Sequence, residues 1–175
     1  MIRRPPRSTL SSSSAASDVY KRQDMQMDYE EGLFIGYRWY EREAIEPLFP
    51  FGHGLSYTTF EYSDLRAIPP KGESSVAAFE VAIKNSGNVS GKEIVQGYVG
   101  SSSSQIERPN KELKKFDKVF LAPGESKKVI FELSERDLSF WNVETNTWQV
   151  EPAEYVFEVG ASATDIREQA TVWLG

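Results

Sequence analysis

The chain has 175 residues, of which 39% are hydrophobic and 13% aromatic, and it contains no cysteine. This composition is sufficient for a hydrophobic core, so the chain is not a disordered protein, and its stability must come from packing without disulfides or thiolate metal sites. The net charge of −6 argues against nucleic acid and anionic membranes as partners, because both require a basic surface. No apolar run approaches the roughly 20 residues that span a bilayer.

Residues 1–23 differ in composition from the rest of the chain. Their serine-rich run provides no apolar core for an export signal. The segment is typical of a sequencing adaptor translated together with an adjoining gene, and the alternative is a flexible serine-rich linker. We therefore exclude residues 1–23 from fold prediction and expect genuine coding sequence to begin near Asp24. The segment contains five basic residues and one acidic residue, which are Arg3, Arg4, Arg7, Lys21, Arg22 and Asp18.

Residues 24–60 contain one predicted strand. From Gly32 to Tyr40, small or polar residues alternate with apolar ones, which favours a short strand, and residues 41–43 are expected to form an exposed turn. The segment offers this strand no partner, so its edges are expected to be unpaired.

The run from Pro47 to Phe60 predicts a rigid connector that is clamped onto two neighbours. Its two prolines fix φ, and Gly52 and Gly54 permit positive φ on either side of His53. Four aromatic side chains are expected to anchor it, and these are Phe49, Phe51, Tyr57 and Phe60.

After Phe60 the pattern becomes that of strands with one buried face. Apolar residues alternate with polar ones in three clear sets, which are Phe79, Val81 and Ile83; Val129, Phe131 and Leu133; and Tyr155, Phe157 and Val159. Turn residues separate the strands at positions 85–88, 122–125 and 142–147. About seven strands without a convincing helix predict an antiparallel β-sandwich.

Trp141 and Trp148 flank the last of these turns and are expected to lie at the base of a hairpin. We expect both rings to be packing residues. If Trp148 were fully buried, its replacement by alanine would cost about 3–5 kcal/mol.

The residues do not define a catalytic or metal site. Acid–base catalysis by a carboxyl pair requires two such groups around a pocket, one of them with a shifted pKa, whereas Asp28, Glu30 and Glu31 form a charged run without a pocket. His53 is the only histidine, which leaves no multi-histidine metal site, and its flanking glycines favour a structural role. We therefore predict no catalytic, cofactor-binding or metal-binding residue.

One group of aromatic residues has two interpretations. Tyr37, Trp39 and Tyr40 could form an aromatic platform for sugar, or they could be buried between domains.

Two single residues are also distinctive. Arg108 is expected to pair with an acidic neighbour, and Asn88 begins a glycosylation sequon that has meaning only in a eukaryotic secretory pathway.

Over about residues 27–175 the chain resembles glycoside hydrolase family 3, the family of β-glucosidases and β-xylosidases. The resemblance rests on motifs in the order of that family, which are Tyr29 to Tyr40, the connector, Glu93 to Val99, Arg108 to Phe116, Ala122 to Glu125 and Arg136 to Trp141. It implies an all-β, fibronectin type III-like (immunoglobulin-like) antiparallel β-sandwich over residues 61–175. Residues 24–60 would be the tail of an α/β-sandwich domain together with the connector.

The resemblance implies a noncatalytic C-terminal part of a β-glucosidase-like enzyme that hydrolyses O-glycosyl bonds when intact. In the family the nucleophile is an aspartate in an N-terminal barrel-like domain, so this chain alone should be inactive. The implied partners are the N-terminal catalytic domains of the same chain and β-linked glycosides, without cofactor, nucleic acid or membrane, and the implied location is periplasmic or secreted. The family usually has a bulky apolar residue in place of Gly97, so the strand there is expected to be weak or bulged. The alternatives are a standalone carbohydrate-binding or adhesive immunoglobulin-like module and an inert spacer between domains.

Overall fold

The computed structural model describes residues 31–101 and 103–175. The predictions for residues 1–23 and for Asp28 and Glu30 lie outside the described residues. Residues Leu33–Gly175 form one compact unit.

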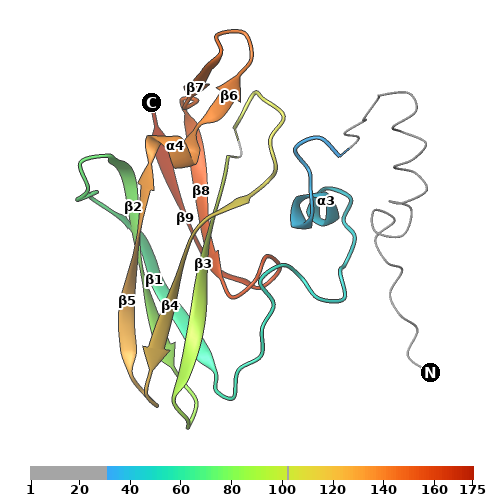
Figure 1. Cartoon of the computed structure of the whole chain (residues 1–175). Coiled ribbons are helices and arrows are strands. Elements are labelled where there is room, and N and C mark those ends of the chain that lie inside the picture. Colours follow the sequence, from blue (N-terminus) through green and yellow to red (C-terminus); the bar gives the residue numbers. More distant parts are fainter. Residues whose placement is uncertain (1–30, 102) are drawn as a thin grey trace, which may run out of the picture. The chain divides into compact units, whose positions relative to one another are not determined.

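Two antiparallel sheets face each other in this unit (Figure 1). The three-stranded sheet has the order β1-β2-β5 and contains β1 (Phe60–Ile68), β2 (Ser75–Asn85) and β5 (Ser126–Ser134). The four-stranded sheet has the order β4-β3-β8-β9 and contains β4 (Glu112–Leu121), β3 (Gly91–Ser101), β8 (Ala153–Gly160) and β9 (Ile166–Leu174). The predicted all-β antiparallel sandwich is confirmed.

The hydrophobic core lies between the two sheets. All nine side chains of the three predicted alternating sets are at most 3% exposed, so the inward face of each strand was predicted correctly. Phe79 of β2 and Phe157 of β8 stack across the interface with ring centroids 4.2 Å apart, and Phe131 lies 5.8 Å from Phe157. These aromatic contacts join the two layers at their centre.

The register of β3 and β4 shifts between Gly97 and Tyr98, which confirms the predicted bulge. The ring of Phe157 explains why glycine stands there. A Cβ atom on Gly97 would lie 2.9 Å from Cζ of Phe157, so the core ring occupies the space that a larger side chain would need.

The segment before the connector differs from the prediction. Residues Tyr37–Arg42 form a helix, α3, instead of the end of a strand, and Glu41 and Arg42 belong to this helix instead of a turn. The backbone has positive φ at Gly32 (53°) and Gly36 (66°), which interrupts an extended path. The isolated strand would also have left its backbone groups without a ladder partner, whereas a helix satisfies them internally.

A short hairpin follows the three-stranded sheet. The four-residue helix α4 (Glu135–Leu138) begins with a capping box between Ser134 and Asp137. It leads into β6 (Phe140–Asn142), which pairs with β7 (Thr147–Gln149), so the described residues contain nine strands instead of about seven.

The predicted positions of Trp141 and Trp148 in this hairpin are confirmed, but neither ring is fully buried, so the cost stated for a fully buried Trp148 does not apply. The two residues are directly opposite each other, with ring centroids 5.4 Å apart, and they are 45% and 47% exposed. Arg136 covers the other side of Trp148, 3.1 Å from the ring centroid. Because half of each ring stays in solvent, loss of Trp148 should cost about 1–2 kcal/mol, the sum of an aromatic pair and a cation–π contact.

We predict that Phe157→Ala lowers the free energy of unfolding by about 3–5 kcal/mol, because it leaves a cavity at the centre of the core. Urea denaturation of the purified chain measures this loss. Phe116→Ala is the matched control, since Phe116 is 70% exposed, and it should change the free energy by no more than about 0.5 kcal/mol. Equal effects of the two substitutions would contradict the assignment of the core.

Candidate functional site

The connector is held to the sandwich at two points. The first is Gln96, on the outer face of β3 and 4% exposed. Its Nε2 donates to the carbonyl oxygens of Gly52 (3.2 Å) and Ala161 (2.6 Å), and its Oε1 accepts from the hydroxyl of Tyr98 (2.6 Å). Nearby, the amide of Ala163 donates to the carbonyl of Phe51 (2.9 Å). One buried amide therefore joins the connector, β3 and the turn that follows β8.

The second point is Asn85, at the end of β2 and fully buried. Its Oδ1 accepts from the hydroxyl of Thr58 (2.7 Å) and the amide of Gly87 (3.0 Å), while its Nδ2 donates to the carbonyls of Val89 (2.8 Å) and Leu121 (3.0 Å). All four hydrogen-bonding positions of this amide are used. Asn85 therefore fixes the end of the connector and two turns at once.

The four predicted aromatic anchors of the connector differ in their burial and contacts. Phe60 is buried, and Phe51 stacks on Tyr37 with ring centroids 4.9 Å apart, as the prediction of anchors required. Phe49 and Tyr57 are 70% and 102% exposed, so the prediction is wrong for them. Positive φ is confirmed for Gly52 (81°) but not for Gly54.

The predicted aromatic platform does not form as a flat surface. Tyr37 is occupied on both sides, since it stacks on Phe51 and meets Tyr98 edge-on at 6.0 Å, and its hydroxyl accepts from the amide of Leu113 (2.8 Å). Trp39 is half-buried and Tyr40 is exposed. Tyr37 is thus an intramolecular contact of α3 with the sandwich.

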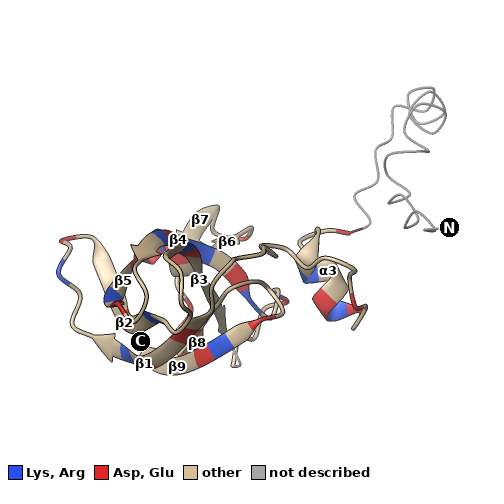
Figure 2. Ribbon diagram, turned by 90° about the horizontal axis from the view of Figure 1, so that it is seen from below, with Lys and Arg blue, Asp and Glu red and all other residues tan. Residues whose placement is uncertain are grey.

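Ion pairs complete the attachment of α3, where acidic and basic residues lie side by side (Figure 2). Arg38 pairs with Glu112 at 2.7 Å. Lys111 lies between two carboxylates, at 3.0 Å from Glu41 and 3.6 Å from Glu158. Such partly exposed pairs each contribute little to stability, but together they fix which face of α3 meets the strands.

The predicted pairing of Arg108 is confirmed. Its Nη2 lies 4.0 Å from Glu112 and donates to the carbonyl of Leu138 (3.3 Å). His53 is exposed, and its ring lies 5.6 Å from that of Phe49. A structural role for His53 stays a prediction.

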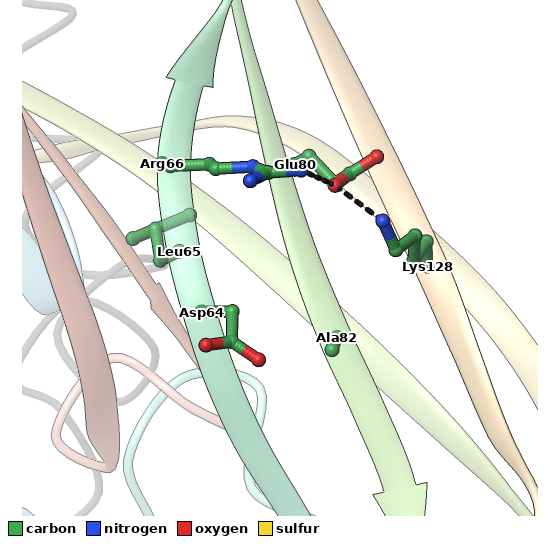
Figure 3. A pocket seen from close by; sticks show the side chains of 6 residues that line it. All are labelled: Asp64, Leu65, Arg66, Glu80, Ala82 and Lys128. Atoms are coloured by element: carbon green, nitrogen blue, oxygen red, sulfur yellow. Dashed lines mark hydrogen bonds and ion pairs between the residues drawn. The ribbon is translucent and has the colours of Figure 1, made fainter.

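A hollow lies on the outer face of the three-stranded sheet (Figure 3). Arg66 and Lys128 both donate to the same oxygen of Glu80, at 2.8 and 2.9 Å. The hydrogen bond from Lys128 makes the largest contribution to lowering the pKa of Glu80, and the hydrogen bond from Arg66 makes the next largest. A carboxylate held ionised in this way is unsuited to act as the general acid of a glycosidase. Asp64 is the other acidic residue of the hollow. Among the described residues, its carboxylate accepts a hydrogen bond from the hydroxyl of Ser63 and not from a group on Glu80.

The described residues contain no group of three or more histidine, cysteine, aspartate or glutamate side chains that could hold a metal ion. Within the same part of the chain, every helix is too short or too polar to cross a membrane.

One half-buried carboxyl group lies beside the first strand. Glu93 of β3 accepts a hydrogen bond from the hydroxyl of Tyr62 (2.8 Å). Burial raises the pKa of Glu93, while the Tyr62 hydrogen bond and the charge of Arg167 act in the opposite direction. Arg167 also donates to the carbonyl of Phe60, so this group of side chains ties β1 to β9 and β3.

The sequence analysis missed Asn85 and Gln96 as anchors of the connector. Asn85 had a signal, because it continues the inward alternation of Phe79, Val81 and Ile83 and is the polar member of that set. Gln96 had none, since it occupies an outward position where a polar residue is expected to meet water.

Comparison with known proteins agrees with this architecture. Residues 93–163 match the family model of the fibronectin type III-like domain. The chain is 49% identical over 146 residues to thermostable β-glucosidase B of Acetivibrio thermocellus, a match that covers 82% of this chain and 19% of the relative. It is 42% identical over 154 residues to β-glucosidase BoGH3A of Bacteroides ovatus, covering 87% and 20%.

Solved structures give the same result. The chain superposes on β-glucosidase D2-BGL of Chaetomella raphigera with a TM-score of 0.79 at 39% identity, covering 85% of this chain and 23% of that one. It superposes on DesR, a β-glucosidase of Streptomyces venezuelae in complex with D-glucose, with a TM-score of 0.80 at 38% identity, covering 87% and 19%. The chain spans about a fifth of the length of the curated relatives it matches, in their C-terminal part.

The sandwich is therefore a fibronectin type III-like domain that carries a pinned N-terminal connector. Over most of its length the chain is similar to the C-terminal part of β-glucosidases of glycoside hydrolase family 3. In the relatives this domain occurs in one protein with a catalytic domain.

We predict that Gly52→Ala detaches the connector from Gln96. The φ of 81° disfavours any side chain, and a Cβ atom would collide with the amide of Gln96, so local stability should fall by about 1–3 kcal/mol. Limited proteolysis should then cut within residues 47–58 faster than in the parent chain. Gly54→Ala is the control, because a Cβ atom there meets nothing within 4 Å, and equal cleavage of the two variants would contradict the prediction.

We predict that Glu93→Gln stabilises the chain more at pH 7 than at pH 3.5. The folded pKa of Glu93 lies above its unfolded value, so ionisation opposes folding, and this cost grows as the pH rises through those two values. Below both values the carboxyl is protonated in both states and the cost vanishes. Urea denaturation of the variant and the parent at both pH values gives the difference, in which the other carboxylates cancel. A stabilisation that is larger at pH 3.5 would contradict the prediction.

Proposed function

We propose that this chain is the supporting, noncatalytic part of a β-glucosidase-like glycoside hydrolase that cleaves O-glycosyl bonds of β-linked glycosides. The activity is supported by the relatives, several of which are β-glucosidases at 37–49% identity. The support for the role is that those relatives carry their catalytic part in the same protein as this domain.

The proposal divides the chain as follows. Residues 1–23 are an adaptor-derived or disordered segment, residues 24–60 are the tail of an α/β-sandwich domain with the connector, and residues 61–175 are the fibronectin type III-like domain. The start of β1 at Phe60 and the family match over residues 93–163 are consistent with the last boundary.

The catalytic carboxylates would lie outside this chain. A retaining glycosidase holds two carboxyl groups about 5–5.5 Å apart, one of them with a raised pKa. Many acidic side chains of the sandwich are instead engaged by lysine or arginine, as in the pairs of Glu80, Glu112 and Asp165. Such neutralised groups suit a structural surface and not a site of proton transfer.

The observation that carries the proposal is the fixation of the connector at both ends by buried amides. A chain that only tethers two domains needs no such contacts and is usually free to move. Here Gln96 holds the backbone at Gly52, and Asn85 holds Thr58. A connector fixed in this way sets the position of whatever precedes it.

We expect a chimera to test this role. Residues 27–175 of this chain would replace the matching C-terminal region of the Acetivibrio thermocellus relative, and a second form of that relative would lack the region. The chimera should hydrolyse an aryl β-glucoside with kcat/KM within about tenfold of the relative, while the shortened form should lose stability and most activity. Full activity of the shortened form would refute a supporting role.

The purified 175-residue chain should hydrolyse no aryl β-glucoside above the rate in buffer. Measurable turnover that survives further purification would refute the noncatalytic assignment. Calorimetric titration with cello-oligosaccharides provides the second arm, because saturable binding by the chain alone would favour the standalone carbohydrate-binding module.

A further inference from the structure

The connector presents two large apolar side chains on a fixed backbone. Leu55 and Tyr57 are 94% and 102% exposed. The residues on either side of them are held by Gln96 at Gly52 and by Asn85 at Thr58. The exposed side chains therefore lie on a stretch of backbone that hydrogen bonds hold on both sides.

A second apolar group lies beside the connector on the outer face of the four-stranded sheet. Ile94 of β3 and Phe116 and Phe120 of β4 all point outward and are exposed. In the pairing of β3 with β4, Phe116 lies directly opposite Gln96, the residue that holds the connector. The connector therefore borders this face of the sheet, and we name the two groups together the apolar surface: Ile94, Phe116, Phe120, Leu55 and Tyr57.

The outer face of the other sheet has a different character. Arg66, Glu80 and Lys128 form an ion-paired group there, as expected for a face in water (Figure 3). Several large apolar side chains on one face of a monomer mark an interaction surface. The contrast between the two sheets assigns that surface to the β4-β3 side.

We propose that the apolar surface is the docking face for the part of the same polypeptide that precedes the connector. This inference rests on the proposed function. The relatives carry about four-fifths of their length outside the region they share with this chain, and that length precedes the shared region. The connector joins the preceding part of the polypeptide to the sandwich. Its apolar side chains are therefore the first to meet that preceding part, and the short link gives them a high effective concentration there.

Charge argues against a second copy of this chain as the occupant. Lys118 is opposite Ile94, and Lys92 is opposite Phe120, so two exposed lysines alternate with the apolar side chains of the sheet. In a two-fold interface a patch meets itself, which would bring these lysines together. The docked part should instead present apolar residues with carboxylates opposite Lys92 and Lys118.

The test uses the active chimera with the photo-cross-linker p-benzoylphenylalanine at position 55, 116 or 130. Ile130 is the matched control, because it is an exposed apolar residue on β5 of the other sheet. Irradiation should link positions 55 and 116 to peptides of the preceding part within one molecule, and position 130 should give no such link. Mass spectrometry of the digested monomer identifies the linked peptides.

Three results would overturn the proposal: links from positions 55 and 116 between two molecules, no links from either, or equal links from position 130. A thermal test gives an independent readout. Leu55→Ser and Phe116→Ser should lower the Tm of the chimera by several degrees and leave that of the 175-residue chain unchanged, whereas Ile130→Ser should change neither. A different result would refute the proposed function and leave the docking face intact: the shortened relative would keep full stability and activity while the links still form.

Discussion

The arrangement of this chain depends on two buried side-chain amides, Asn85 and Gln96. A buried amide that lost its partners would cost about 1–3 kcal/mol, so each one fixes the groups that satisfy it. Asn85 satisfies the turn after β2, the end of β4 and Thr58, while Gln96 satisfies Gly52 and Ala161. The connector has no strand partner over this stretch, and without these two amides its backbone would have little reason to follow one path.

The ion pairs around α3 have a different role. Lys111 shares two carboxylates and Arg38 meets Glu112, yet all of these groups keep part of their surface in water. Pairs of this kind contribute at most about 1 kcal/mol each. The stacking of Tyr37 on Phe51 and its contact with Tyr98 are not screened by salt, so they account better for the docking of the helix, and the charges account for its orientation.

The core of the sandwich could be predicted from the sequence because it is encoded locally. Alternation within β2, β5 and β8 requires only that neighbouring side chains of a strand point to opposite sides, and the three turns between strands carry their own turn residues. The bulge at Gly97 was expected from comparison with the family, whereas the ring of Phe157, which leaves no room for a side chain at position 97, lies 60 residues away in the chain.

The functional region could not be predicted in the same way, because its contacts are between distant parts of the chain. The hydroxyl of Tyr37 meets Leu113, and Gln96 meets Gly52. Nothing near Tyr37 or Gln96 in the sequence indicates these contacts. The alternation around Gly36 therefore suggested a strand, and Gln96 looked like an ordinary residue of a wet face. The burial of Trp148 also depends on its neighbours, since Trp141 and Arg136 cover only part of the ring.

Fixation of the connector also changes the energetics of contact through the apolar surface. Ordering a free segment costs roughly 1–2 kcal/mol per residue for the backbone alone. The residues on either side of Leu55 and Tyr57 are already held by Asn85 and Gln96, so much of this cost is met when the sandwich folds. Burial of these side chains against a partner can then contribute more fully to affinity, which is the advantage of preorganisation. A fibronectin type III-like sandwich is suited to this role because its rigid sheets hold both amides in place, and the connector can present its apolar side chains without a core of its own.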